Sequence, residues 1–170
     1  GRSFASAPAA EVAGGSVYRC VRWASESGDA FVKLAAADSL AALEAEAAGL
    51  QALAKADALR VPAVLAVGDA GGHALLALEW LDLEPAAASD GTVQAQLGER
   101  LAMQHRRTAP RCGWQRDNTI GATPQLNAWD DDWVRFFRER RLGFQLDLAG
   151  ANGLGSKVVE RGRELGERCG

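Results

Sequence analysis

Three groups in the first third of the chain could together bind a polyphosphate: a glycine pair, a strand lysine and a helix glutamate. They are Gly14-Gly15-Ser16, Lys33 and Glu46. Because glycine lacks a Cβ, the backbone amides of such a pair can approach an anion closely. Lys33 supplies a cation and Glu46 a carboxylate that can orient it. In this order the three groups predict phosphate binding of the kind that phosphoryl transfer requires.

Each of the three groups also has a simpler interpretation. The glycines suit an ordinary turn, and a lysine in an alternating strand often points to solvent. Glu46 can lie at the edge of a helix stripe, in contact with water. The neighbours Phe31, Val32 and Leu34 favour a buried strand, where a lone ammonium is costly without an anion.

Composition sets broad limits on the function. The chain has 170 residues, 48% hydrophobic and 24% charged, with a formal net charge of -3. This charge argues against nucleic-acid binding, and no apolar run approaches the ~18 residues of a membrane span. The cysteines are Cys20, Cys112 and Cys169, which form no Cys-x-x-Cys pair. We therefore expect a reducing cytoplasm and no zinc site.

The first half of the chain has the pattern of a small antiparallel sheet with one inserted helix. Residues 1–11 look like a loose lead-in, and turn residues separate the predicted elements. Strands are expected at 17–23, 30–34, 63–67 and 73–78. The helix is expected at 39–55, capped by Asp38 or Ser39. Five strands with one helix after the lysine strand is the order of a kinase small lobe, in which Glu79, Trp80 and Leu81 would form the adenine hinge.

The second half is predicted to be mainly helical. Residues 84–91 read as a linker, and a helix follows at 92–108. His105 lies on the apolar face of this helix, and we expect it to be a core residue rather than a base. Residues 113–127 read as a long ordered loop, and loops of this kind often carry binding groups. Asn127 is expected to cap a helix from Ala128, and Asn118, Gln125 and Asn127 are substrate-contact candidates by polarity and placement.

Several stretches together resemble the fructosamine/ketosamine kinase family, a branch of the protein-kinase-like phosphotransferases that includes aminoglycoside and choline kinases. The resemblance covers residues 12–149. Its most distinctive part is the block at 113–142, GWQRDNTIGATPQLNAWDDDWVRFFRERRL. The other stretches are GGS at 14–16, FVK at 31–33, EAAGLQAL at 46–53, RVPAVLAVG at 60–68, LALEWLDL at 76–83 and LAMQH at 101–105.

The resemblance implies an α+β, protein-kinase-like fold. Residues 1–83 would form the nucleotide-binding small lobe, 84–91 a linker, and 92–170 the first helices of a truncated large lobe. It implies ATP and Mg²⁺ as cofactors, with Lys33 on the phosphates, Glu46 paired with Lys33, and Gly14, Gly15 and Ser16 covering them. The activity would be phosphorylation of the sugar 3-hydroxyl of ketoamine adducts on proteins or small amines, which repairs glycated protein.

The chain departs from the family where catalysis would occur. The family has a His-Gly-Asp-type loop, and metal-binding residues follow it. Here His73 is followed by Ala74-Leu75, His105 by Arg106-Arg107, and no Asp-Phe-Gly equivalent occurs. Without these groups we expect this chain alone to be inactive, with no catalytic or metal residue of its own. The alternatives are a kinase of the same fold for another hydroxylated substrate, and a non-catalytic nucleotide-binding or interaction module.

Overall fold

The computed structural model describes residues 9–12, 17–25, 28–84, 91–121 and 123–168. The chain divides into two compact units, Gly1–Thr108 and Ala109–Gly170, here called the sheet unit and the helical unit. The division neither confirms nor contradicts the predicted lobe boundary, because most of the linker at 84–91 lies outside the described residues. Gly14, Gly15, Ser16 and Cys169 also lie outside them.

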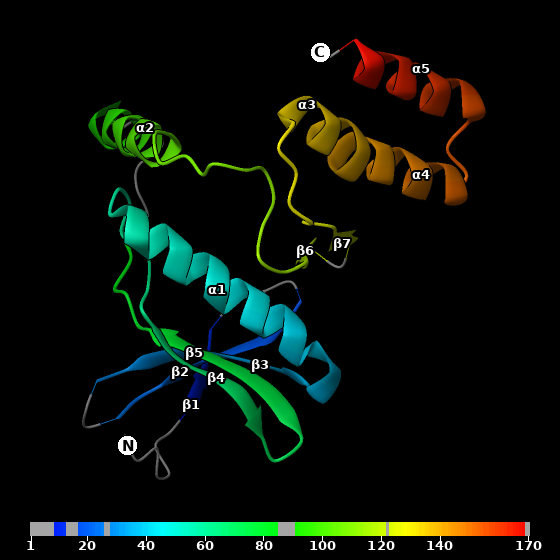
Figure 1. Cartoon of the computed structure of the whole chain (residues 1–170). Coiled ribbons are helices and arrows are strands. Elements are labelled where there is room, and N and C mark those ends of the chain that lie inside the picture. Colours follow the sequence, from blue (N-terminus) through cyan, green and yellow to red (C-terminus); the bar gives the residue numbers. More distant parts are fainter. Residues whose placement is uncertain (1–8, 13–16, 26–27, 85–90, 122, 169–170) are drawn as a thin grey trace. The chain divides into compact units, whose positions relative to one another are not determined.

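The sheet unit is built on a five-stranded antiparallel sheet in the order β1-β2-β3-β5-β4 (Figure 1). The strands are β1 (Ala9–Glu11), β2 (Arg19–Trp23), β3 (Ala30–Ala36), β4 (Val64–Ala70) and β5 (His73–Glu79). The expectation of a loose lead-in at 1–11 is wrong for its last three residues, because β1 pairs with β2 from Ala9 to Glu11. The other strands overlap the predicted ranges, but β4 continues three residues beyond its predicted end at 67, to Ala70.

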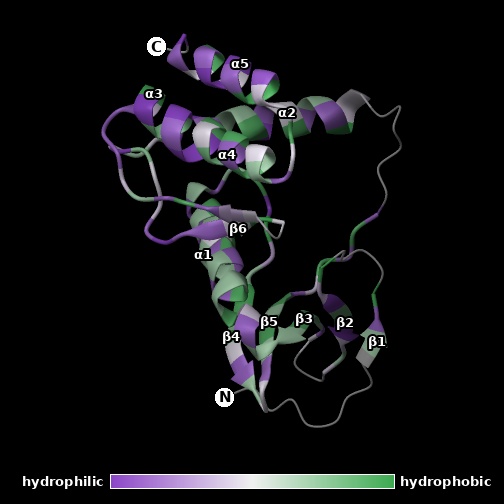
Figure 2. Cartoon of the chain, turned by 90° about the vertical axis from the view of Figure 1, so that its right-hand side faces the viewer, coloured by the Kyte–Doolittle hydropathy of each residue, from purple (hydrophilic) through white to green (hydrophobic). Residues whose placement is uncertain are grey.

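Both faces of the sheet carry an apolar cluster. One face packs Leu76 and Leu78 against Leu43 and Ala47 of α1. The other gathers Val21, Ala30, Val32 and Ala77. Figure 2 shows the hydrophobic colours on β3 and β5, the central strands that contribute to both clusters. Because successive strand residues point to opposite faces, the face of each side chain on β3 is fixed by its register.

Helix α1 (Leu40–Ala56) follows a single 3-10 turn, Ala37–Ser39. The predicted cap is wrong, because Ser39 has helical backbone angles and makes no side-chain capping hydrogen bond. The 3-10 turn feeds the chain directly into the helix instead. At its other end the helix stops at Asp57, whose left-handed φ of 50° ends the helical path.

Helix α2 (Gly91–His105) has no buried residue. Leu97 and Leu101 are exposed, as is His105. The prediction of a core histidine is therefore wrong in this structure. Spacings of four do place the three side chains on one face, but no described residue buries that face.

The helical unit contains a small hairpin and two antiparallel helical segments (Figure 1). The hairpin pairs β6 (Asn118–Ile120) with β7 (Thr123–Gln125), so the predicted irregular loop at 113–127 contains regular structure. The longer helical segment comprises α3 (Trp133–Phe136), the π-helical turn η2 (Phe137–Gly143) and α4 (Phe144–Ala151). Helix α5 (Ser156–Glu167) packs back on η2 and α4.

The close approach of α5 depends on a glycine. A Cβ at Gly162 would lie 2.5 Å from Cδ2 of Leu146, so the leucine packs directly on the backbone of α5. The helix predicted from Ala128 instead begins at Trp133, where the Asp132 side chain accepts a 3.0 Å hydrogen bond from the Arg135 amide. Asn127 is not the cap, because its side-chain amide forms hydrogen bonds with Arg116, Asn118 and Arg141 instead.

Candidate functional site

Lys33 and Glu46 form an ion pair between β3 and α1. The Lys33 Nζ lies 2.6 Å from the Glu46 Oε1. On the sheet, Lys33 is opposite Cys20 on one side and Leu76 on the other, which places it on the face that α1 covers. The predicted inward projection of Glu46 is confirmed, because its carboxylate reaches this strand.

The ion pair is only half-buried, which leaves it accessible to a ligand. The two side chains retain 24% and 32% of their exposure. An ammonium has three donors, and within the described residues Lys33 uses one of them, on Glu46. Glu46 therefore fixes the Lys33 ammonium at the sheet surface, and the ammonium keeps donors that a ligand can use. Its contribution to stability should be small, since exposed pairs give about 0–1 kcal/mol.

The end of β5 is fixed by the side chain of Glu79. Its carboxylate accepts hydrogen bonds from Arg60 Nη2 at 2.5 Å and from the Ala63 amide at 3.1 Å. Its own amide donates to the Ala63 carbonyl at 2.8 Å. The Ala63 hydrogen bond lowers the pKa of Glu79, and the Arg60 guanidinium lowers it further. Glu79 thus anchors the segment and uses its polar groups internally.

The next two residues differ from Glu79. Within the described part of the chain, the backbone groups of Trp80 and Leu81 make no hydrogen bond to other backbone. The indole of Trp80 donates to Asp82 Oδ1 at 2.8 Å, and the Arg22 guanidinium lies 4.4 Å from its ring centre. Asp29 accepts a 2.6 Å hydrogen bond from Arg22 Nε. The ring is therefore held in place while the backbone beside it stays available.

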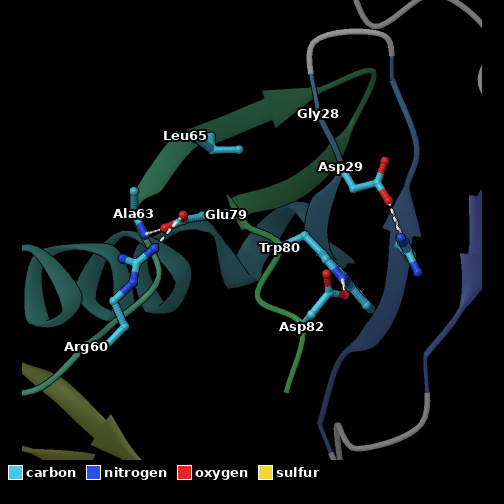
Figure 3. Close-up of a pocket in the computed structure, with 9 residues that line it drawn as sticks. Gly28, Asp29, Arg60, Ala63, Leu65, Glu79, Trp80 and Asp82 are labelled. Carbon is cyan, nitrogen blue, oxygen red and sulfur yellow. Dashed lines mark hydrogen bonds and ion pairs between the residues drawn. The ribbon is translucent and has the colours of Figure 1, made fainter. Parts of the chain in front are cut away.

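These residues line an open pocket of about 600 Å³ at the end of the sheet (Figure 3). Its lining residues are Arg22, Gly28, Asp29, Arg60, Ala63, Leu65, Glu79, Trp80 and Asp82. Lys33 and Glu46 are not among them. The ion pair and this pocket, here called the hinge pocket, are therefore separate features of the sheet unit. The sequence analysis missed Arg22, Asp29 and Arg60, because their pairing depends on strand register rather than on a local motif. It also missed Asp82, which accepts from the Trp80 indole two residues earlier.

The helical unit places Asn127 in a buried polar cluster. Asn127 is 2% exposed. Its side-chain amide donates to the Arg116 carbonyl and to Asn118 Oδ1 at 3.1 and 2.8 Å, and its Oδ1 accepts from Arg141 at 2.5 Å. Both amide hydrogens are thus used within the chain. Gln125, the third substrate candidate, is half-buried beside a different cavity.

A second buried polar residue, Asp130, fixes the start of α3. Its carboxylate accepts from Arg135 Nη2 and Nε at 2.5 and 3.0 Å and from the Asp132 amide at 2.8 Å. These bonds, that of Arg135 first, lower the pKa of Asp130 to about 2. Its backbone pairs with Cys112 through two 2.8 Å hydrogen bonds. Asp130 therefore ties the strand-like segment at Cys112 to the helix.

The described residues contain neither a cluster of metal ligands nor a helix that could span a membrane. No group of three or more His, Cys, Asp or Glu side chains there could hold a metal ion. The helices in those ranges are also too short or too polar to cross a membrane.

Comparison with known proteins identifies the family. The family model described as fructosamine kinase matches residues 1–168. The chain belongs to the fructosamine kinase family. A protein from Synechocystis named "Probable ketoamine kinase" is 44% identical over 120 residues, covering 70% of this chain and 40% of that protein. The "Protein-ribulosamine 3-kinase, chloroplastic" of Arabidopsis thaliana is 36% identical, covering 91% of this chain and 47% of that protein.

A solved structure gives the same answer for the fold. The crystal structure titled "Putative fructosamine-3-kinase" from Haemophilus somnus aligns with a TM-score of 0.79 and 26% identity. The alignment covers 94% of this chain and 53% of that one. The predicted α+β, protein-kinase-like fold is therefore confirmed. The chain spans about half the length of the relatives that it matches.

Proposed function

We propose that this chain forms the nucleotide-binding part of an ATP-dependent kinase that phosphorylates ketoamine sugars of the fructosamine or ribulosamine type on proteins or small amines. The observation that carries the proposal is the half-buried ion pair of Lys33 and Glu46, 2.6 Å apart, in a chain of the fructosamine kinase family. The names of the two relatives, a ketoamine kinase and a protein-ribulosamine kinase, support the substrate class. The product would serve the repair of glycated molecules in the cytoplasm.

Each predicted site residue has a distinct part in this proposal. Lys33 donates to the ATP phosphates, and Glu46 holds its ammonium in place across the gap between β3 and α1. Gly14-Gly15-Ser16 cover the phosphates with backbone amides. The free backbone groups of Trp80 and Leu81 pair with the adenine edge, while Glu79 anchors them through Arg60 and Ala63.

In this proposal the base and the metal-binding carboxylates that carry out phosphoryl transfer do not belong to this chain. The 170-residue sequence contains no His-Gly-Asp or Asp-Phe-Gly segment, and its described residues hold no metal-ligand cluster. Without a base for the hydroxyl and carboxylates for Mg²⁺, this chain alone would bind nucleotide without transferring phosphate. The second candidate is a non-catalytic nucleotide-binding module that keeps the Lys33–Glu46 pair.

Calorimetric titration of the 170-residue chain with ATP and Mg²⁺ tests the nucleotide site. We expect weak saturable binding that Lys33→Met abolishes, because that change removes the cation and leaves the strand intact. Lys55→Met is the matched control, since Lys55 is exposed at the end of α1. Binding that survives in the Lys33 variant, or falls equally in both variants, would contradict the role of Lys33.

A second measurement separates the two candidate functions. A protein that contains this chain together with the remaining length of its relatives is assayed for phosphate transfer to a fructosamine and to a ribulosamine. Turnover that Lys33→Met removes supports the kinase. Nucleotide binding without turnover on either substrate supports the module.

A further inference from the structure

The helical unit contains a pocket that the proposed nucleotide site does not use. It has a volume of about 350 Å³, within the range of about 300–1,000 Å³ typical of small-molecule sites. The hairpin β6–β7 forms one wall, and η2 with the start of α4 forms the other. The lining residues are Ile120, Thr123, Pro124, Gln125, Phe137, Arg140, Arg141, Leu142, Phe144 and Gln145. Most of the wall is apolar.

Arg140 has an unsatisfied group in this pocket. Its Nε is buried and has no hydrogen-bond partner. Among the described residues no carboxylate forms an ion pair with its guanidinium. Buried polar groups without a partner are rare in native proteins and require an explanation. Because this Nε is shielded from solvent, a ligand in the pocket would be bound by the other guanidinium N–H groups of Arg140, which lines the pocket.

Arg141 adds a second positive charge to the same wall. Its guanidinium donates to neutral acceptors, the Leu126 carbonyl at 2.7 Å and Asn127 Oδ1 at 2.5 Å, and lies 4.5 Å from the Phe136 ring centre. Burial lowers the pKa of Arg141, and the adjacent charge of Arg140 lowers it further. Two neighbouring arginines therefore line one pocket, and neither forms an ion pair with a carboxylate of the described residues.

Several arginines elsewhere in the unit differ from the two in the pocket. Four other arginines of the unit each contact a carboxylate: Arg111 contacts Asp131, Arg135 contacts Asp130, Arg138 contacts Glu139 and Arg163 contacts Asp147. None of these four lines the pocket. Arg140 and Arg141, by contrast, line the pocket and have no carboxylate within ion-pair distance among the described residues.

We propose that this pocket binds a small organic anion with an oxyanion head, carboxylate or phosphate, on an apolar body. The planar guanidinium of Arg140 matches either head through paired hydrogen bonds. Phe137, Leu142 and Phe144 would contact the apolar body. Gln125, predicted from the sequence to contact substrate, lies on the opposite wall, which the hairpin forms. The inference goes beyond nucleotide binding and does not depend on it.

Nuclear magnetic resonance titration of the 170-residue chain tests the pocket, with the Nε–H signal of Arg140 as the readout. The probes are benzoate, phenyl phosphate and inorganic phosphate. We expect saturable shifts with benzoate or phenyl phosphate, and weaker binding of inorganic phosphate, which has no apolar body. Arg140→Gln should weaken binding by about tenfold or more, because a charge-assisted pair is lost.

Arg161→Gln is the matched control. It removes one positive charge from an exposed position of the same unit, outside the pocket lining. Its effect on binding should stay below about twofold, as screened surface charges predict. Lys33→Met should leave these titrations unchanged, so failure of this pocket and failure of the nucleotide site are distinguishable.

Binding of only one aromatic probe assigns the head as carboxylate or phosphate. The proposal is overturned by the absence of a saturable shift at Arg140, by equal losses in the two arginine variants, or by inorganic phosphate binding as tightly as phenyl phosphate. The shift at Arg140 is measured in the unaltered chain, so the test holds even if Arg140→Gln does not fold.

Discussion

Two polar clusters, one in the sheet unit and one in the helical unit, use hydrogen bonds in opposite ways. Lys33 and Glu46 in the sheet unit keep 24% and 32% of their exposure, and Lys33 retains spare donors. Asn127 in the helical unit is 2% exposed, and both its amide hydrogens are used within the chain. The first cluster can bind a ligand without losing existing bonds. The second would have to break internal bonds first.

The stretch of sequence that identifies the family most clearly is therefore not the stretch whose side chains are free to bind a ligand. The block at 113–142 is the most distinctive stretch of the sequence, yet Asn127 and Asp130 within it bond to other parts of the same block. The Lys33 and Glu46 motifs are individually weak as sequence patterns, yet they meet in space. A distinctive sequence can thus reflect the demands of a buried network, which tolerates few substitutions because each partner would be left unsatisfied.

The largest expected effect comes from a double-mutant cycle on the ion pair in a catalytically complete protein. Lys33→Met should lower kcat by about 1,000-fold, and Glu46→Gln by about 100-fold, because preorganised charge near the phosphates is lost. If Glu46 acts by positioning Lys33, adding Glu46→Gln to Lys33→Met should change kcat by less than about threefold. Multiplicative losses would show instead that Glu46 acts separately from Lys33.

The next effect tests the internal role of Asn127. Asn127→Ala should lower the free energy of unfolding by about 3 kcal/mol, because it removes the hydrogen bonds that the buried Asn127 side chain makes with the Arg116 carbonyl, Asn118 and Arg141. Urea denaturation measures the change. The control is Asn152→Ala, at an exposed turn position, which should change stability by less than about 0.5 kcal/mol. An unchanged stability with loss of sugar binding would show that Asn127 is a substrate contact after all.

Acid should affect the helical unit through Asp130. Its pKa is lowered to about 2 in the folded chain, from an ordinary value of 3.8. A lowered pKa means stabilisation that is fully present above the unfolded value and is lost as the pH falls from about 4 towards 2. Urea midpoints measured between pH 5 and pH 2 should therefore fall, and Asp130→Asn should remove part of that fall. Asp131→Asn, at an exposed position, should leave the pH profile nearly unchanged.

The sequence predicts those features that depend on local patterns. Alternation places the four longer strands, and spacings of three and four place α1 with Glu46 towards the sheet. Those two results bring Lys33 and Glu46 together, so their pairing is predictable. The protein-kinase-like fold follows from the resemblance.

Features that depend on distant partners could not be predicted in this way. The bond between Arg60 and Glu79 joins residues 19 positions apart, and only the register of β4 and β5 brings them together. The start of α3 was predicted at Ala128, because asparagine is a good helix cap. Asn127 instead bonds to Asn118 and Arg141 in a buried cluster, and Asp132 caps the helix.

The smallest expected effect compares the hinge pocket with the ion pair. Arg22→Gln removes the guanidinium that lies 4.4 Å from the Trp80 ring, and should weaken ATP binding only about two- to fivefold, as an exposed cation–π contact predicts. Arg19→Gln is the control on the same strand. Register places Arg19 on the opposite face of the sheet, where it pairs with Glu11. A loss with Arg22→Gln as large as with Lys33→Met, measured by calorimetry, would move the main nucleotide contact from the ion pair to the hinge pocket.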